Sequence, residues 1–503
     1  MKANPTRIPR WVLAATLGAS LAASGTAWAE DASISTAVLL KRIEELEKQV
    51  KQLQGTPSAI AAQTPLATST NEVARIDSLE QKVKVIERKD EIANEAAAEK
   101  AKTTPVVTVG SNGLTVRTPD TNFLFRVRGY VQVDDRLFLG DSAGTDSLLL
   151  RRVRPIFEGT VYDRFDYRVM LDLGSGQSLS VNNNNLVQDA YVNARITPGL
   201  QVRVGKDKEP VGLERLQSGA NLLFVERAFP TLLVPNRDVG VQLRGEAYNG
   251  ALEYQTGVFN GTANGGSIDY DNNADKDVAG RVFTQPFKNG DSDLLRGFGV
   301  GIAGTIGNQD GTLRNLTSPG QQPIFSYLSG TGATNSPLVR ADGQNWRVTP
   351  QGWYYLGPFG LFWEWVSSNQ ELARVAGKTT EFQRADNKAW QVATSYFLTG
   401  EDNQWKPVAP RNNFNFSGEG WGPLELAARV SQLNLDPDLF PLYANSQTSI
   451  TEALEWAVGL NWYLNRNIKF SVDYSNTHYT GGNLNPITSN DESVILSQVQ
   501  FSF

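Results

Sequence analysis

Residues 122–136 read NFLFRVRGYVQVDDR, and this stretch decides the fold class. Its odd positions include Phe123, Phe125, Val127, Val131 and Val133, whereas most even positions hold arginine, tyrosine, glutamine or aspartate. Side chains alternate between the two faces of a strand, so this strand has one apolar face and one charged face. A strand that faces lipid on one side and a polar lumen on the other has this pattern.

Fifteen further segments repeat the alternation toward the C-terminus. With the first they give sixteen candidate strands, an even number that suits a closed barrel with an open lumen. The sequence therefore predicts an all-β, 16-stranded antiparallel transmembrane β-barrel over residues 119–503. Its other strands are expected at Arg151–Tyr162, Phe165–Leu173, Asp189–Ile196, Leu200–Lys206, Val239–Tyr248, Leu252–Phe259, Asp277–Thr284, Phe298–Ile306, Trp346–Tyr354, Phe359–Ser367, Trp390–Leu398, Leu424–Leu433, Trp456–Leu464, Ile468–Tyr474 and Val494–Phe503.

The expected connections alternate between short turns, such as Pro198-Gly199 and Gly357-Pro358, and long loops. Short periplasmic turns opposite long outer loops are typical of such barrels. The chain ends in an alternating strand whose last residue is Phe503, an ending that resembles the signal read by the outer-membrane assembly machinery. The long loops are expected at Gly174–Gln188, Lys206–Arg237, Gly261–Lys276, Gly307–Asn345, Asn369–Lys388 and Asn476–Glu492.

The first 29 residues have the three parts of a secretory signal peptide. Basic residues precede an apolar run at Trp11–Ala23, and Ala27-Trp28-Ala29 is a cleavage signal. The apolar run is too short for a membrane anchor, and no other segment has 18 consecutive apolar residues. We therefore expect an exported chain that crosses a membrane only as strands, in the Gram-negative outer membrane.

Residues 30–102 contain two heptad stretches. Apolar residues at this spacing drive helices together, so we expect a periplasmic coiled coil and hence an oligomer. A lone amphipathic helix remains the alternative, because each stretch covers only about two heptads. The seam positions are Leu39, Ile43, Leu46, Val50 and Leu53 in the first stretch and Ile76, Leu79, Val83 and Ile86 in the second.

The alternation also assigns the basic residues of the strands to the lumen. An arginine on the lipid face would cost about 2–4 kcal/mol at the bilayer midplane. Acidic residues share the lumen, and the whole chain carries a formal charge of -6, so local clustering must decide any selectivity. The arginines assigned to the lumen include Arg126, Arg128, Arg152, Arg154, Arg203 and Arg244.

The best candidate for a constriction is the long stretch Lys206–Arg237. Lysines and arginines on a loop folded against a basic wall would bind anions, with lysine as a point charge and arginine as a bidentate donor. Alternatively, these cations only hold the loop through ion pairs with Asp207, Glu209, Glu214 and Glu226.

Several motifs resemble one family, the phosphate-selective porins O and P. They are LRRVR at 150–154, QDAYV at 188–192, GLER at 212–215, FVER at 224–227, YFLTGE at 396–401, LELAARVS at 424–431 and GLNWYLN at 459–465. The resemblance implies a homotrimer of 16-stranded barrels that passes anions such as phosphate or polyphosphate. It also implies a constriction of wall arginines, an aspartate and a loop lysine. The similar positions here are Arg151 and Arg152, Asp189, and Lys206 or Lys208, with Arg215 nearby. Arg154 belongs to the same basic cluster of candidate anion-binding residues.

One departure favours anion passage over phosphate specificity. Phosphate-selective members guide anions along an arginine ladder, but Gly307–Asn345 holds only Arg314 and Arg340. A general or carboxylate-type porin is therefore an alternative, as is a structural tether between outer membrane and cell wall. With no cysteine and one histidine, His478, the chain shows no enzyme signature, metal site or cofactor site. Its acidic balance gives no indication of nucleic-acid binding.

Overall fold

The computed structural model describes residues 70–503 except positions 141, 143, 175–185, 272, 419 and 482–490. The signal peptide expected at residues 1–29 and the heptads at residues 39–53 lie outside the described residues. The chain divides into two units, residues 1–92 and 93–503. The described part of the first unit belongs to α3 (Thr70–Thr103), one continuous helix.

Helix α3 has its apolar seam in solvent in this single chain. Leu79, Val83 and Ile86 are each more than half exposed, at 55%, 51% and 58%. The described residues include no helix that is both long and apolar enough to cross a bilayer.

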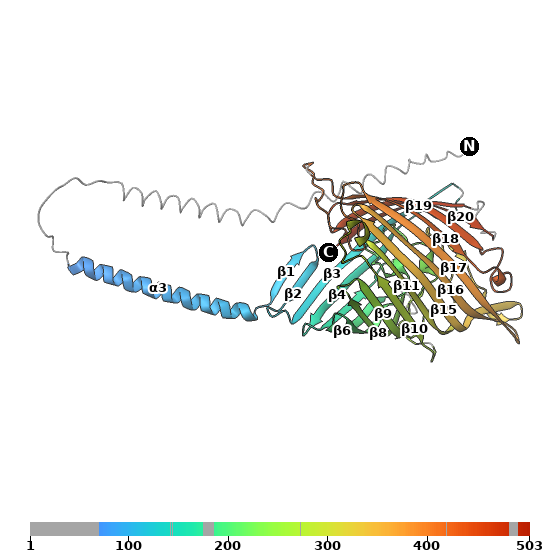
Figure 1. Cartoon of the computed structure of the whole chain (residues 1–503), viewed down its shortest axis with the longest axis horizontal. Coiled ribbons are helices and arrows are strands. Elements are labelled where there is room, and N and C mark those ends of the chain that lie inside the picture. The colour runs from blue at the N-terminus through green and yellow to red at the C-terminus, as the bar shows by residue number, and fades with distance from the viewer. Residues whose placement is uncertain are drawn as a thin grey trace, which may run out of the picture. The chain divides into compact units, whose positions relative to one another are not determined.

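All sixteen predicted barrel strands are present, and each pairs antiparallel with the next (Figure 1). Their bounds are β3 (Phe123–Leu139), β4 (Ser147–Val161), β5 (Phe165–Leu171), β6 (Val187–Thr197), β7 (Leu200–Lys208), β8 (Arg237–Ala247), β9 (Leu252–Phe259), β10 (Asp277–Thr284), β11 (Phe298–Gly311), β15 (Ser336–Leu356), β16 (Phe359–Ala376), β17 (Thr379–Phe397), β18 (Leu424–Asn434), β19 (Glu452–Tyr463), β20 (Ile468–Thr480) and β21 (Asp491–Ser502).

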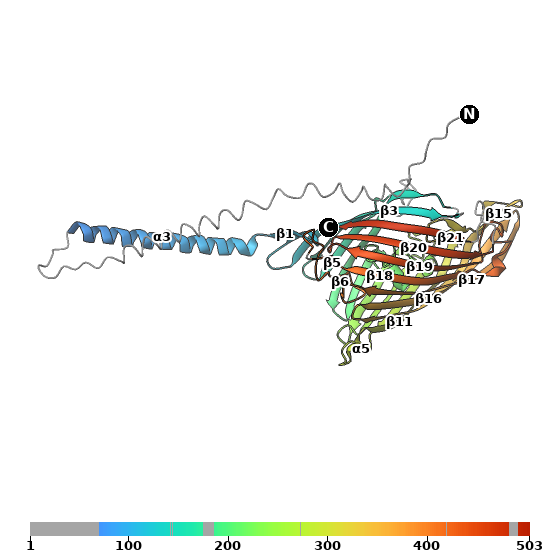
Figure 2. The ribbon, with the colours of Figure 1, turned by 90° about the horizontal axis from the view of Figure 1, so that it is seen from above.

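The barrel closes where its last strand meets its first. Strand β21 pairs antiparallel with β3 from Ser493 opposite Leu139 to Ser502 opposite Tyr130, and Figure 2 shows the two strands side by side. Beyond the strand, Phe503 and Gly129 exchange backbone hydrogen bonds of 2.9 and 3.0 Å. A Cβ on residue 129 would lie 2.9 Å from the Phe503 ring, so this close approach requires glycine.

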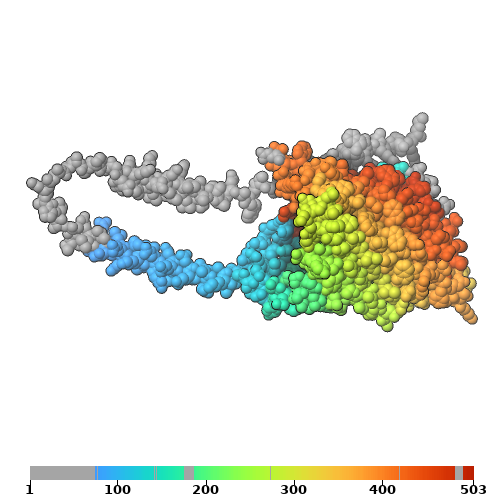
Figure 3. All heavy atoms as spheres, viewed as in Figure 1, coloured from blue at the N-terminus to red at the C-terminus, as the bar shows by residue number. Residues whose placement is uncertain are grey.

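The two faces of the strands follow the predicted register. On β3 the outward Phe123 and Phe125 are exposed, whereas the inward Gln132 and Asp134 are buried. The same alternation continues around the barrel, and Figure 3 shows the outer surface of the later strands in yellow-green to red. An apolar outer face and a polar inner face fit a barrel in lipid.

The sequence analysis was wrong about one loop and missed several elements. The long loop expected at Asn369–Lys388 is a two-residue turn, because β16 and β17 continue past the expected ends. The hairpin of β1 (Val106–Gly110) and β2 (Gly113–Arg117) was not predicted, and it extends the sheet beside β3. Within the loop after β11 lie three further short strands, β12 (Leu316–Thr317), β13 (Pro323–Phe325) and β14 (Ser329–Ala333).

The connection between β17 and β18, residues 398–423, was also missed. This connection lies at the end of the barrel where the short turns, such as Pro198-Gly199 and Gly357-Pro358, join the other strands, and we call this end the turn end. The connection is much longer than those turns. We call it the long turn. The connection between β10 and β11 at the same end contains a short helix, α5 (Asp293–Arg296).

Much of one side of the lumen is filled by a packed core. The loop at residues 209–236, which we call the inward loop, contains α4 (Leu213–Leu216) and the 3₁₀ turn η1 (Phe229–Leu232). The loop after β18 contains a second 3₁₀ turn, η2 (Pro437–Leu439). Apolar residues of both loops and of β12–β13 pack together against strands β15–β20 and, through Phe259 and Ala279, against β9 and β10. The loop residues of this core include Val211, Phe229, Leu233, Ile324, Phe325, Leu439 and Ile450.

Candidate functional site

The inward loop is fixed to the barrel wall by carboxylates that accept its backbone N–H groups. Glu364 on β16 accepts from Leu213 at 2.5 Å, and Asp473 on β20 accepts from Val225 at 2.5 Å. Charge-assisted hydrogen bonds of this kind are stronger than neutral ones. The loop therefore lies along the β16–β20 side of the lumen.

The tip of the loop reaches the strands where the barrel closes. Gln132 donates to the Gly219 carbonyl at 2.9 Å, Lys469 to the Leu222 carbonyl at 2.9 Å and Gln500 to the Ala220 carbonyl at 3.2 Å. The inward loop and its contacts thus occupy the lumen from β16 round to β3. A cavity lies on the other side, against the strands from β3 to β10.

A β-bulge turns both members of the Arg151-Arg152 pair into the lumen. Gln132 lies opposite Arg152 and Val133 lies opposite Leu150, so Arg151 is the extra residue of the bulge. A bulge of this kind redirects a side chain without ending the strand. Consecutive arginines on a regular strand would point to opposite faces.

Both arginines meet Glu226 of the inward loop. Arg151 Nε donates to Glu226 at 2.6 Å, and an Arg152 nitrogen lies 3.9 Å from the same carboxylate. Burial would raise the pKa of Glu226, but attraction to Arg151, Arg152 and Arg136 together with the Arg151 hydrogen bond outweighs it and lowers the pKa to about 2. The arginine pair therefore holds the loop.

A cavity of about 300 Å³, which we call the open passage, is bounded by β3–β10, β15, the inward loop and the long turn. Six arginines and Lys208 line it against three carboxylates, an excess of positive charge. These residues are Arg154, Arg168, Arg203, Arg237, Arg244, Arg281, Asp189, Asp207 and Glu253.

The cations of the open passage are only partly neutralised. Asp189 is shared by Arg237 at 2.8 Å and Arg168 at 3.1 Å. Arg203 pairs with Asp207, Arg281 lies 3.7 Å from Glu253, and Arg154 pairs at 2.8 Å with Asp172 behind the lining. Arg168 also lies 3.8 Å from Glu158. Five carboxylates thus pair with five of the seven cations.

Two cations of the open passage have no carboxylate partner within the described part of the chain. Lys208 donates to the Gln217 carbonyl at 2.6 Å, and Arg244 forms no hydrogen bond or ion pair there. Both can therefore bind a solute without breaking an existing ion pair.

The structure separates the predicted site residues into two groups. Arg154, Asp189, Lys208, Arg203 and Arg244 line the open passage. The others lie elsewhere: Arg151 and Arg152 bind Glu226, Lys206 pairs with Asp269, Arg215 donates to the Thr231 carbonyl, and Arg126 and Arg128 lie beside Glu158. The structural alternative, in which cations hold the loop, thus describes Arg151, Arg152 and Arg215.

Four of the lining residues that were absent from the predicted site are arginines or tryptophans on β8, β10, β15 and the long turn. Arg237 and Arg281 occupy inward positions on β8 and β10, so the alternation that placed Arg244 could have found them. Trp353 is inward on β15, although the other strand tryptophans face outward. Trp405 lies on the long turn, and no periodicity in the sequence marks it.

The closed sixteen-stranded barrel with an apolar exterior and a loop folded into its lumen defines a β-barrel channel of the outer membrane. The family model for phosphate-selective porin O and P matches residues 125–503, about three quarters of the chain. The chain therefore belongs to this family, whose members are channels rather than enzymes.

Individual relatives are distant. Porin O of Pseudomonas aeruginosa is 22% identical over 397 residues, covering 73% of this chain and 86% of that protein. The outer membrane channel DcaP of Acinetobacter baumannii is 11% identical with a TM-score of 0.47, over 77% of this chain and 99% of that one. An anion-selective porin from Comamonas acidovorans is 11% identical with a TM-score of 0.44, over 76% and 100%.

The Glu226 contacts predict how the inward loop responds to acid. Because the folded pKa of Glu226 is lowered from 4.5 to about 2, the stabilisation is complete above about pH 4.5 and is lost as the pH falls through about 2. A shift of that size corresponds to about 3 kcal/mol. Glu226→Gln should therefore loosen the loop already at neutral pH, and open-channel current noise in planar bilayers measures this.

Glu381→Gln is the matched control, because Glu381 pairs with Arg374 on the outer hairpin. Native and Glu381→Gln channels should stay quiet from about pH 7 down to about pH 4. Equal noise in the Glu226→Gln channel and the native channel would contradict the anchoring role.

Proposed function

We propose that the chain is a passive outer-membrane diffusion channel that prefers anions, among them phosphate, polyphosphate or similar small oxyanions. The main support for this proposal is the lining of the open passage, which contains seven cationic side chains and three carboxylates. A narrow passage between low-dielectric walls strengthens the field of such a cluster. The overall negative charge of the chain has little influence there.

The proposed route of an anion uses several weak sites in succession. Arg244 and Lys208, which have no carboxylate partner among the described residues, are proposed as the first contacts. The Arg168–Asp189–Arg237 group would then exchange one arginine contact for the solute. Permeation needs binding that is favourable enough for entry and weak enough for release.

Support for phosphate specificity is thinner. Arg340 pairs with Asp342 at 2.8 Å, and Arg347, at the outer half of β15, is fully buried 3.6 Å from Asp277. Neither offers a free guanidinium above the open passage. Of the two arginines in the outer loop, only Arg314 has no ion pair within the described residues. The proposed specificity is therefore for anions as a class, and a general or carboxylate-type porin fits the same lining.

We also propose that the channel is a homotrimer joined in part by a periplasmic coiled coil of residues 30–102, behind a cleaved signal peptide at 1–29. The exposed seam of α3 supports the coiled coil. Strands β5, β9 and β10 have only 7, 8 and 8 residues. A strand needs about 9–11 residues to cross a bilayer. Contact between copies near these short strands would therefore shield this part of the barrel wall from lipid. Phe503 is the proposed recognition signal for the assembly machinery.

Replacing Arg244 tests the proposed anion preference. Arg244→Gln should lower the anion-to-cation permeability ratio, because one unit charge at close range contributes about 1 kcal/mol, or roughly fivefold. The reversal potential under a potassium chloride gradient in planar bilayers measures the ratio. Arg314→Gln, in the outer loop after β11, is the control and should change it little. A native reversal potential of cation sign would overturn the proposal, and equal effects of both variants would misplace the selective site.

Single cysteines test the proposed coiled coil, since the chain has none of its own. Val83→Cys places a thiol on the seam, and Lys84→Cys places one beside it. Oxidation should crosslink two copies in Val83→Cys channels much more than in Lys84→Cys channels, as seen by non-reducing gel electrophoresis. Equal crosslinking of the two variants would favour a lone helix over a coiled coil. The alternative of a tether that links outer membrane and cell wall through the coiled coil would then lose its support.

A further inference from the structure

The open passage has aromatic rings beside its arginines. Barrel lumens are mostly polar, yet Phe283, Trp353 and Phe362 point inward near the turn end of β10, β15 and β16. The Phe283 and Trp353 rings lie 4.0 Å apart between centroids. Together with Leu213 and Phe224 of the inward loop, these rings form an apolar patch beside the passage.

The long turn adds a second indole to this patch. Trp405 stacks on Trp353 with centroids 4.9 Å apart and an interplanar angle of 20°, and it meets Phe362 edge-on at 6.3 Å. The turn is anchored by Asn403, whose backbone N–H donates to the Gly357 carbonyl at 2.6 Å and whose side chain donates to Ser395 at 2.7 Å. Trp405 is thus held in place while it remains half-buried and lines the open passage.

The arginines of the passage already lie over aromatic rings. The Arg281 guanidinium lies 4.6 Å from the Phe283 ring centroid, and the Arg203 guanidinium lies 4.0 Å from that of Tyr191. A solute in the open passage therefore meets aromatic rings and guanidinium donors in the same cavity. Inorganic phosphate has no apolar surface to bury against the indoles, whereas a benzoate ring does.

We propose that the preferred solutes of the open passage are small aromatic carboxylates, each a flat ring carrying one or two carboxylate groups. The ring packs against Trp405 in the lining of the passage, and the carboxylate takes bidentate hydrogen bonds from an arginine such as Arg244 or Arg281. This inference rests on the proposed anion preference and narrows it to a substrate class.

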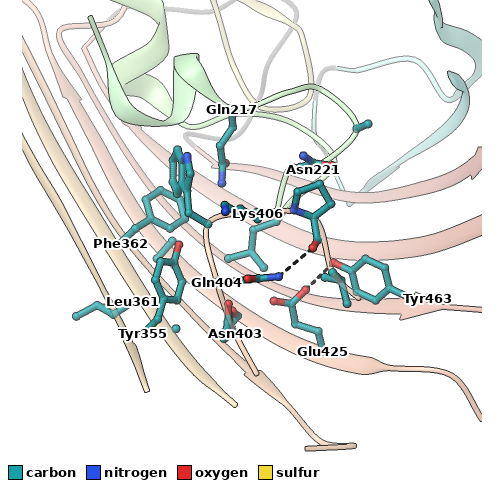
Figure 4. A pocket seen from close by; sticks show the side chains of 18 residues that line it. Gln217, Asn221, Tyr355, Leu361, Phe362, Asn403, Gln404, Lys406, Glu425 and Tyr463 are labelled. Atoms are coloured by element: carbon teal, nitrogen blue, oxygen red, sulfur yellow. Dashed lines mark hydrogen bonds between the residues drawn. The ribbon is translucent and has the colours of Figure 1, made fainter. Parts of the chain in front are cut away.

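Trp405 also lines a second cavity. This smaller cavity of about 60 Å³ lies between the inward loop and the long turn. Figure 4 shows Gln217 and Asn221 of the inward loop facing Gln404 and Lys406 of the long turn across it. The exposed Lys406 directly follows Trp405 in the chain and lines the same smaller cavity, so a cationic side chain is available there.

The test compares anions of equal charge with and without a ring. The block of chloride current through the full-length native channel should occur at a concentration of benzoate about fivefold or more below that of acetate, because stacking on an aromatic side chain is worth at least about this factor. Trp405→Leu should remove most of this difference, because it deletes the ring on which benzoate stacks. Trp405→Tyr, which keeps a ring, should retain most of it.

Trp421→Leu is the matched control, because Trp421 lies on the same long turn but is 68% exposed and lines neither cavity. It should behave as the native channel. Equal block of the native channel by benzoate and acetate, with an anion-sign reversal potential, would overturn the aromatic inference and leave the anion preference intact. A cation-sign reversal potential would overturn both. If Trp405→Leu and Trp405→Tyr lose discrimination equally, Trp405 only packs the long turn, and the inference fails.

Discussion

Backbone hydrogen bonding in lipid is the constraint on which this structure depends. Hydrocarbon offers no partner to an unpaired N–H or C=O group, so a sheet can cross the membrane only if it has no edge. The pairing of β21 with β3 removes that edge, and the contact between Phe503 and Gly129 continues the pairing beyond the strand. Closure in turn fixes the register, which decides that arginines face inward and large apolar residues outward.

A closed barrel of sixteen strands is wide, and this chain narrows it on one side only. The inward loop, the loops after β11 and β18 and the strands behind them form a packed core. Carboxylates on the wall bind loop N–H groups, and Glu226 of the loop binds the arginine pair of the bulge. Flow is thereby restricted to the side of β4–β10, where the cations are in excess. The same arginine-rich sequence thus serves two purposes, since Arg151 and Arg152 hold the loop while Arg244 remains free of ion pairs among the described residues.

The barrel could be predicted from the sequence because its alternation is strictly local. All sixteen strands and the inward direction of Arg154, Arg203 and Arg244 followed from a period of two. The roles of Arg151 and Arg152 could not be predicted, because a bulge breaks that period and because their partner, Glu226, lies 75 and 74 positions away. Trp405 was missed for a related reason: its position depends on contacts with Trp353 and Phe362, which are distant in sequence. The turn between β16 and β17 was misjudged since polar residues on strands above the membrane resemble those of a loop.

The central claim is that solutes pass only along the β4–β10 side of the lumen. Thiol accessibility measures this directly, because any cysteine introduced is the only one in the chain. Gln255→Cys lies on the lining of the open passage, and Ser431→Cys lies on the packed side, where Ser431 is fully buried. An anionic methanethiosulfonate reagent should react with the Gln255→Cys channel within seconds and reduce its conductance, and should leave the Ser431→Cys channel unmodified. Rapid modification of both, or of Ser431→Cys alone, would contradict the account.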